Sequence, residues 1–232
     1  MTFQQGKYMQ HDRMAVLSAI MSQGVIPVFY HADFEICRNV IQACSNAGAK
    51  CIEFTNRGDF AASHFLDLAR HFAKADPSVI LGVGSIVDAP TAGLYIANGA
   101  KFIVGPVLNP DVAKVCNRRK IPYSPGCGSA TEISQAEELG CEIVKVFPGA
   151  QVGGPDFVKS VLGPMPWTRM MPTGGVDPTE ASLKAWFDAG IVAAGIGSKL
   201  ITSELLKAQD YAGIETRVRE TVEMIKTIRG TK

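Results

Sequence analysis

The 232-residue sequence lacks an excess of charge of either sign: 23 lysines and arginines stand against 22 aspartates and glutamates, a formal net charge of +1. Its densest basic run is Arg118-Arg119-Lys120, too small a cluster for the basic surface that nucleic-acid binding requires. Long apolar runs are also missing, since segment 14–21 is too short to cross a membrane and carries no signal-cleavage pattern. We therefore expect a cytoplasmic protein with neither nucleic acid nor a membrane as partner.

Residues with metal-binding or cross-linking chemistry are few and scattered. The six cysteines include no C-x-x-C pair, so neither a zinc site nor a disulfide framework is indicated. The four histidines show no spacing typical of metal ligands. We expect no metal site and no cofactor, which leaves the chemistry to the chain's own side chains.

The sequence has no Pro/Ser-rich linker, and its composition, 47% apolar and 19% charged, is that of a globular protein. Short β-rich segments recur, separated by amphipathic helical segments; they are residues 25–30, 51–55, 79–85, 102–106, 121–126, 141–147, 170–175 and 191–197. Four helical segments end at a glycine that fits the left-handed position after a helix: Gly48, Gly99, Gly140 and Gly190. The pattern predicts a single domain over residues 25–232, preceded by an extension, residues 1–24, with an extra helix at 10–23.

Eight strands that alternate with helices predict a parallel sheet with crossover helices, and in this length they fit a (β/α)₈ TIM barrel. A doubly wound sheet is the alternative. It requires a phosphate-binding glycine turn after the first strand, and Tyr30-His31-Ala32-Asp33 is not such a turn. The α/β barrel is therefore our expectation.

Two charged residues interrupt strands that otherwise read as buried. In segments 51–55 and 141–147 the even-numbered apolar residues form the side expected to face the helices. Because side chains alternate along a strand, Glu53 and Lys145 are directed into the barrel. Both lie in the later part of their strands, the end at which barrel active sites are built. The alternation thus brings an amine and a carboxyl group into one small interior.

Two interpretations of this pair are open. One is a buried structural ion pair, although desolvation often cancels the Coulomb gain of such pairs. The other is a nucleophilic lysine: burial and a neighbouring cation, for which Arg57 is the candidate, lower the pKa of an amine so that it can attack a carbonyl and form an imine. Glu53 would then carry protons while a C–C bond breaks. That is aldolase chemistry, and it needs no metal.

Glycine-rich turns follow the seventh and eighth expected strands, in PTGGVDPTE (172–180) and GIGSKLI (195–201). In barrels a phosphate often lies where these two turns meet, held by backbone N–H groups. The candidate residues for the phosphate are Gly174, Gly175, Gly197 and Ser198, and Thr173 in the first of these turns is a candidate for binding the substrate. The alternative is that these glycines only make tight turns.

The segment Gly82-Val83-Gly84-Ser85 resembles part of a dinucleotide-binding loop, but it follows the third strand and lacks the third glycine. Ser85 is better interpreted as a hydroxyl at the mouth of the barrel, available to a substrate carboxylate. Pro106 and Pro125-Gly126 end the fourth and fifth strands, and we expect them to shape the pocket.

The motifs IPVFY, IEFTNRGDF, LGVGS, GAKFIVGP, SPGCGS, VKVFPG, MPTGG and GIGS follow one another from residue 25 to about residue 201. In this order they resemble the KDPG/KHG aldolases, which cleave 2-keto-3-deoxy-6-phosphogluconate and often 4-hydroxy-2-oxoglutarate to give pyruvate. The resemblance implies a class I, Schiff-base mechanism on a trimeric (β/α)₈ barrel.

The resemblance also implies roles for individual residues. Lys145 matches the Schiff-base lysine and Glu53 the general acid/base. Arg57 matches the residue that engages the pyruvyl carboxylate, with Ser85 in place of a family threonine, and Phe147 lies beside the imine. By the same resemblance, Gly174, Gly175, Gly197 and Ser198 match the residues that bind the phosphate. The chain departs from the family pattern at FPG, where FPA is more familiar, and in the residues Gly149-Ala150-Gln151-Val152.

The leading hypothesis is a pyruvate-forming aldolase whose partner is a small phosphorylated keto-deoxy sugar acid. Two other classes remain: a barrel isomerase or epimerase that uses Glu53 as a base without a covalent intermediate, and a non-catalytic protein that binds sugar phosphates. Retained turnover after Lys145→Met would favour the isomerase or epimerase. Binding of a sugar phosphate without formation of a product would favour the binding protein.

Overall fold

The computed structural model describes residues 11–230. Within residues 11–230, nine short strands make up the parallel sheet structure: β1 Val25–Phe29, β2 Cys51–Thr55, β3 Ile80–Gly84, β4 Ile103–Val104, β5 Tyr123–Ser124, β6 Gly126–Cys127, β7 Val144–Val146, β8 Met170–Pro172 and β9 Ala194–Ile196. The described part of the chain also contains ten helices: α1 Arg13–Gln23, α2 Phe34–Asn46, α3 Ala61–Ala75, α4 Ala89–Ala97, α5 Pro110–Arg119, α6 Ala130–Glu138, α7 Gly154–Leu162, α8 Glu180–Asp188, α9 Ser203–Lys207 and α10 Tyr211–Arg229.

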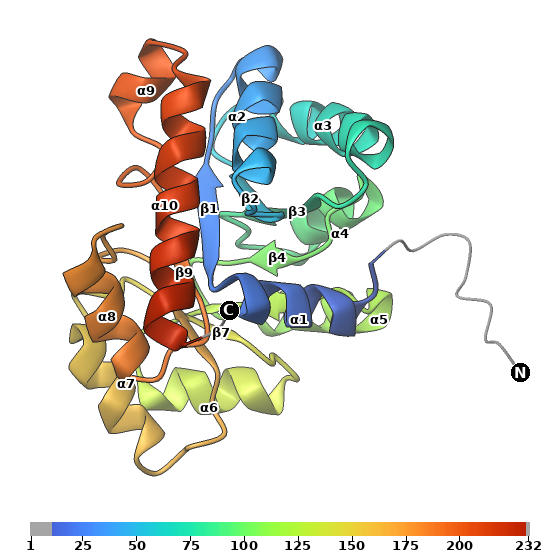
Figure 1. Cartoon of the computed structure of the whole chain (residues 1–232). Helices are drawn as coiled ribbons and strands as arrows, with labels where there is room; N and C mark the ends of the chain where they lie inside the picture. The colour runs from blue at the N-terminus through green and yellow to red at the C-terminus, as the bar shows by residue number, and fades with distance from the viewer. Residues whose placement is uncertain (1–10, 231–232) are drawn as a thin grey trace, which may run out of the picture.

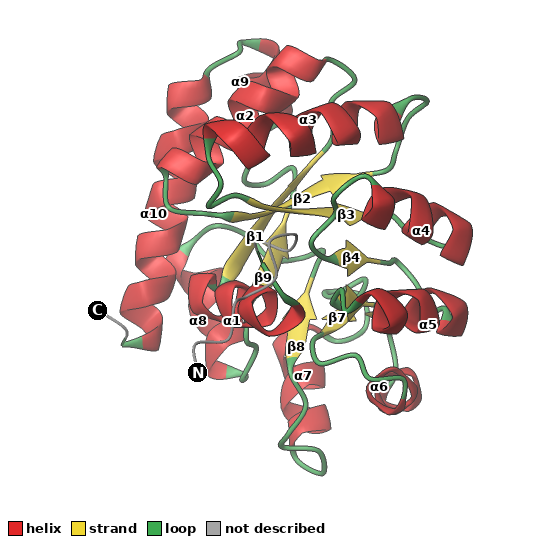
Figure 2. Ribbon diagram, turned by 90° about the vertical axis from the view of Figure 1, so that its right-hand side faces the viewer, coloured by secondary structure: helices red, strands yellow, loops and turns green. Residues whose placement is uncertain are grey.

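The strands form a curled, wholly parallel arrangement with helices on its outside (Figures 1 and 2). One sheet has the order β5-β4-β3-β2-β1-β9 and the other the order β6-β7-β8. A single bridge between Thr173 and Gly195 links β8 to β9. The predicted α/β class and parallel pairing are therefore confirmed, whereas one continuous eight-stranded barrel ladder is not.

The fifth expected strand, residues 121–126, is divided into β5 and β6 at Pro125. Proline has no N–H to donate to a ladder, so pairing stops there. The carbonyl group of Pro125 remains free to accept a hydrogen bond. Lys145 N donates to Pro125 O at 3.0 Å, which keeps β7 beside the divided strand.

The expected helix ends are confirmed. The four glycines predicted after helices have left-handed φ values of 91°, 105°, 81° and 105°: Gly48, Gly99, Gly140 and Gly190. The expected extra helix is α1, and the part of the extension before residue 11 lies outside the described residues. No helix in residues 11–230 is long and apolar enough to cross a membrane.

Helix α1 begins at an Asp12 cap, whose carboxylate accepts a hydrogen bond from Ala15 N at 2.8 Å. Its apolar side packs on the interior side of the sheet, so α1 covers one end of the curled sheet. Arg13 fixes this position: its guanidinium donates to both carboxylate oxygens of Glu142, at 2.7 and 2.8 Å, and to Asn117 Oδ1 at 2.8 Å. The opposite end of the sheet, where the strands finish, holds the cavity that is described below.

Candidate active site

Strand alternation separates two apolar layers. Ile52 and Val144 belong to the layer between sheet and helices. Cys51 and Ile143 belong to the interior layer that packs on α1. Glu53 and Lys145 have the same parity as these interior residues, and their side chains are 2% and 6% exposed. The structure thus brings the predicted carboxyl group and the predicted amine into the interior.

The two carboxylate oxygens of Glu53 have different surroundings. Oε1 lies against the backbone of β3, and Oε2 has no hydrogen-bond partner among the described residues. A Cβ on Gly84 would lie 1.7 Å from Glu53 Oε1, so the absence of a side chain there makes room for the carboxylate. Glu53 Oε2 is buried and forms no hydrogen bond with the described residues. Burial raises the pKa of Glu53, and the positive charges of Lys145 and Arg57 partly offset this rise. The carboxyl group is therefore biased toward holding a proton.

Lys145 forms no hydrogen bond or ion pair with any side chain in residues 11–230, and its Nζ lies 4.7 Å from the centroid of the Phe147 ring. Burial lowers the pKa of Lys145, the Glu53 carboxylate raises it, and Arg57 lowers it further. The direct ion pair of the structural interpretation is not formed. Instead, the two groups influence each other across the interior while the amine is biased toward its neutral form.

Arg57 and Ser85 come together at the ends of β2 and β3. Arg57 Nε donates to Ser85 Oγ at 3.2 Å. Ser85 has a φ of 63°, a left-handed conformation that is uncommon for a residue with a side chain. Together the two side chains present a cation and a hydroxyl, groups that suit a carboxylate ligand.

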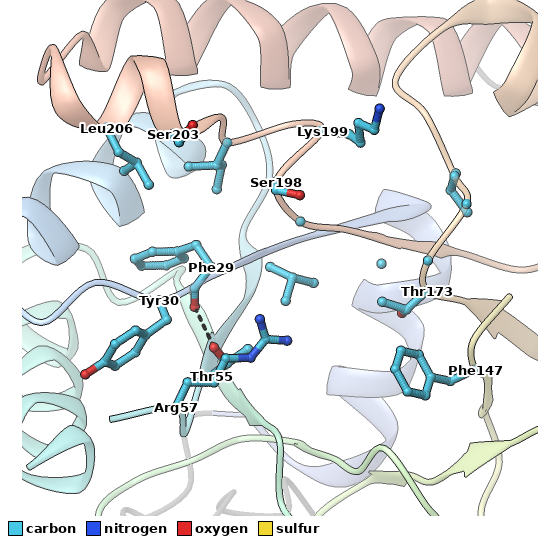
Figure 3. Close-up of a pocket in the computed structure, with 17 residues that line it drawn as sticks. Phe29, Tyr30, Thr55, Arg57, Phe147, Thr173, Ser198, Lys199, Ser203 and Leu206 are labelled. Carbon is cyan, nitrogen blue, oxygen red and sulfur yellow. Dashed lines mark hydrogen bonds between the residues drawn. The ribbon is translucent and has the colours of Figure 1, made fainter. Parts of the chain in front are cut away.

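Figure 3 shows a cavity of about 550 Å³ and the residues that line it. Seven of the predicted site residues line it, namely Arg57, Phe147, Thr173, Gly174, Gly175, Gly197 and Ser198. The other four do not: Glu53, Lys145, Ser85 and Pro106. Thr55 and Phe147, which line the cavity, follow Glu53 and Lys145 by two residues on the same strand faces. The buried pair therefore lies one side-chain layer below the cavity floor.

The turns after β8 and β9 supply one wall of the cavity. Gly174 and Gly175 have φ values of 86° and 82°, which side chains rarely adopt. Thr173 Oγ1 is buried without a hydrogen-bond partner, and a Cβ on Gly195 would lie 2.4 Å from it. We call residues 173–175 the cradle. It offers an unsatisfied hydroxyl and an exposed backbone to a ligand.

Pro106 packs beside the lysine strand rather than on the cavity. A Cβ on Gly126 would lie 2.1 Å from Pro106 O, and Gly126 pairs with Lys145 in the sheet register. Neither Pro106 nor Pro125-Gly126 lines the cavity, so the expectation that they shape the pocket stays a prediction.

Several cavity residues were not identified as site residues in the sequence. Strand parity places Val28 on the interior face, a signal that could have found it. Tyr30 follows β1 and packs against Phe54 of the outer layer, so parity does not find it. Ser203 and Leu206 come from α9, a five-residue helix. Nothing in the sequence indicates that this helix folds over the cavity.

Among residues 11–230, no three histidine, cysteine, aspartate or glutamate side chains cluster in a way that could hold a metal ion.

These features place the chain among α/β proteins with a buried amine and a buried carboxyl group beneath an open, glycine-lined pocket. The family model described as KDPG and KHG aldolase matches residues 16–217, and the chain belongs to this family. The resemblance inferred from the motifs is thereby confirmed.

Individual relatives are distant but align over nearly their full length. The chain is 26% identical to a 2-dehydro-3-deoxy-phosphogluconate aldolase of Haemophilus influenzae, over 94% of this chain and 100% of the relative. It is 28% identical to the KHG/KDPG aldolase of Escherichia coli, with the same two coverages. Among solved structures, the KDPG aldolase of Legionella pneumophila, captured with pyruvate as a covalent carbinolamine, superposes with a TM-score of 0.81 at 23% identity, over 92% and 99% of the two chains. At that identity the likeness supports the fold alone.

Proposed function

We propose that the protein is a class I aldolase that cleaves 2-keto-3-deoxy-6-phosphogluconate to pyruvate and glyceraldehyde 3-phosphate, and 4-hydroxy-2-oxoglutarate to pyruvate and glyoxylate. The observation that carries the proposal is Lys145, a buried amine without an ion-pair partner among the described residues, in the same interior as Glu53. Membership of the aldolase family supports it.

In the proposed mechanism the neutral amine of Lys145 attacks the C2 ketone to form a carbinolamine. Protonated Glu53 gives its proton to the departing hydroxyl group, which leaves as water, so that a protonated imine and the Glu53 carboxylate remain. The lowered pKa of Lys145 favours the attack because only the unprotonated amine is nucleophilic. Glu53 in its carboxylate form then accepts the C4 hydroxyl proton. The C3–C4 bond breaks, its electron pair moves into the imine to form an enamine, and the aldehyde leaves.

Glu53 then returns the proton to C3 of the enamine, and water hydrolyses the resulting imine to pyruvate and free Lys145. A carboxyl group that both accepts and donates a proton works best with a pKa closer to neutrality than that of an exposed glutamate. The burial that raises the pKa of Glu53 supplies this property. Its unpartnered Oε2 is the oxygen left available for the substrate proton.

The rest of the site holds the substrate's two ends. Arg57, with Ser85, binds the carboxylate next to the ketone, and Phe147 packs beside the imine. Thr173, Gly174, Gly175, Gly197 and Ser198 bind the phosphate. All of these residues except Ser85 line one cavity, and Ser85 is hydrogen-bonded to Arg57, which supports the assignment.

A coupled assay tests the function: each substrate is added and pyruvate is followed with lactate dehydrogenase. We expect pyruvate from both substrates in the wild type and from neither in Lys145→Met. Turnover retained by Lys145→Met would contradict the mechanism and favour the isomerase or epimerase alternative. Binding of substrate without any pyruvate would favour a binding protein.

We further propose that the strands close into a complete (β/α)₈ barrel. Both interruptions of the ladder are local, one at Pro125 and one beside the Thr173–Gly195 bridge. Residues from strands of both sheets, among them Val28 in β1 and Met171 in β8, share one interior cluster. An interior filled by alternate residues of every strand is typical of a closed barrel.

We also propose a cytoplasmic homotrimer. Four large apolar side chains are exposed on three consecutive strand–helix units, namely Phe60, Val87, Leu94 and Val107, at 79%, 51%, 50% and 51%. Exposed apolar groups on neighbouring elements are typical of interaction surfaces, and we call these four residues the apolar patch. The six cysteines are all free and buried, which suits a reducing compartment.

A further inference from the structure

The turn after β7 lies directly against the cradle after β8. Gly149 N donates to Thr173 O at 2.9 Å, and Ala150 N donates to Gly174 O at 3.0 Å. Two successive residues of one turn therefore fix two successive peptide groups of the other. Gly149 is also one of the positions at which the chain departs from the family pattern resembled by its sequence.

These two hydrogen bonds determine where the cradle's N–H groups point. In a trans peptide the C=O and the following N–H point in opposite directions. Because Thr173 O and Gly174 O face the 149–150 turn, the N–H groups of Gly174 and Gly175 point away from it. The cavity borders Gly174 and Gly175 but neither Gly149 nor Ala150, so that opposite side is the cavity side. Neither N–H donates a hydrogen bond to another of the described residues.

Two adjacent free N–H groups that point the same way form a concave anion site. Close packing maintains this arrangement. A Cβ on Gly149 would lie 2.7 Å from Gly174 O, and a Cβ on Gly175 would lie 2.2 Å from the Ala150 methyl carbon. Gly149 is buried and Ala150 exposed, so the two contacts differ in how much a substitution there would disturb the core.

We propose that Gly149 and Ala150 are positioning residues for the cradle, and that they set how strongly the protein prefers a phosphorylated substrate to the same substrate without phosphate. This rests on the proposed aldolase function for its kinetic consequence, but not for its effect on anion binding. A side chain at position 149 displaces Gly174 O and turns the N–H of Gly175 away from the phosphate. Position 149 thus acts on the distal end of the substrate, although it is only four residues from Lys145.

The test compares wild type, Gly149→Ala and the control Gly163→Ala. The control makes the same change directly after α7, where the nearest atom to an added Cβ is 3.6 Å away. We measure kcat/KM for 2-keto-3-deoxy-6-phosphogluconate and for unphosphorylated 2-keto-3-deoxygluconate. We expect the ratio of the two to fall about tenfold in Gly149→Ala, the effect of misdirecting one hydrogen bond to a charged group, and to stay at the wild-type value in the control. An unaltered ratio, or an equal loss for both substrates, would overturn the proposal.

Binding of glycerol 3-phosphate, followed by titration calorimetry, gives a readout that needs no turnover. We expect binding about tenfold weaker in Gly149→Ala; binding equal to wild type would overturn the proposal even if the enzyme were inactive. Failure of the wild type to form pyruvate would instead reject the aldolase function alone. If Gly149→Ala does not fold, the same two measurements are made on Ala150→Val, whose larger exposed side chain presses on Gly175. We expect this variant also to have a lower ratio of kcat/KM values and weaker binding of glycerol 3-phosphate, and wild-type values for both would overturn the proposal.

Discussion

Glu53 and Lys145 are both placed where their charged forms are disfavoured. A buried carboxylate and a buried ammonium each cost free energy unless they pair closely, and these two do not form a direct ion pair. The arrangement makes sense as chemistry rather than as stabilisation, because it keeps an amine able to lose its proton and a carboxyl group able to hold one. Replacing either charge should therefore stabilise the fold while removing activity.

The pH dependence of stability tests this reading of Glu53. Its pKa is higher in the folded than in the unfolded state, so its favourable contribution is complete below the unfolded pKa, about 4.3, and is lost as the pH rises through the folded pKa. Glu53→Gln, which cannot ionise, should be more stable than wild type at pH 8 by at least about 3 °C in Tm, and this gap should shrink toward pH 4.

Thermal unfolding at several pH values measures this gap, with Glu138→Gln on α6 as an exposed control for the loss of one negative charge. A gap that is constant, or that grows as the pH falls, would mean that Glu53 is stabilised as a carboxylate in the folded protein.

Gly84 should matter because of the Glu53 carboxylate. In Gly84→Ala the new methyl group collides with Glu53 Oε1, so we expect exchange of the pyruvate methyl protons with solvent to slow at least about tenfold. The extent of pyruvate trapping on Lys145 should persist. The shorter carboxyl side chain of Glu53→Asp, added to Gly84→Ala, should restore part of the exchange. Gly93→Ala on α4, where an added Cβ meets nothing within 4 Å, is the control; equal slowing in both single variants would rule out the collision as the cause.

At the scale of single elements, the Arg13 contacts predict how α1 contributes to stability. The Arg13 side chain is 14% exposed and joins α1 to Glu142, Asn117 and the carbonyl of Gly140. Arg13→Ala should lower Tm by about 5 °C and leave kcat/KM intact at temperatures well below the transition, because α1 lies at the end of the sheet away from the cavity. Lys114→Ala, which removes an exposed ion pair, should change Tm by less than about 2 °C. Similar losses in the two variants would contradict the role of Arg13.

The sequence was sufficient for elements whose pattern repeats along the chain. Strand alternation directed Glu53 and Lys145 inward, and glycine turns located the cradle, because both signals are local. It was insufficient where distant segments meet. The approach of Leu206 on α9 to the cavity depends on packing between elements. The division of the fifth strand is different, because Pro125 is a local signal that the expected strand 121–126 did not take into account.

The role of Gly84 was missed because it depends on the pairing of β2 with β3. The register places Glu53 beside Gly82, and the Glu53 carboxylate extends along β3 to Gly84.

At the scale of the whole molecule, the apolar patch predicts how copies associate. Leu94→Lys together with Val107→Lys should convert the proposed trimer to a monomer, because charges replace apolar groups that a partner would bury. Light scattering after gel filtration measures the mass. Trp167→Lys is the control: it replaces an exposed apolar residue between α7 and β8, outside the patch, and should leave the mass unaltered. A monomeric wild type, or a double variant with the wild-type mass, would contradict the assignment of this surface.

The most direct test of the central claim is borohydride trapping. Protein is incubated with pyruvate, reduced and digested, and the adduct is located by mass spectrometry, with Lys145→Met and the surface variant Lys114→Met treated in parallel. The account predicts a pyruvate-derived mass increment on the peptide that contains Lys145, retained in Lys114→Met and lost in Lys145→Met. An adduct on a different lysine, or no adduct in protein that is folded and forms pyruvate, would contradict it.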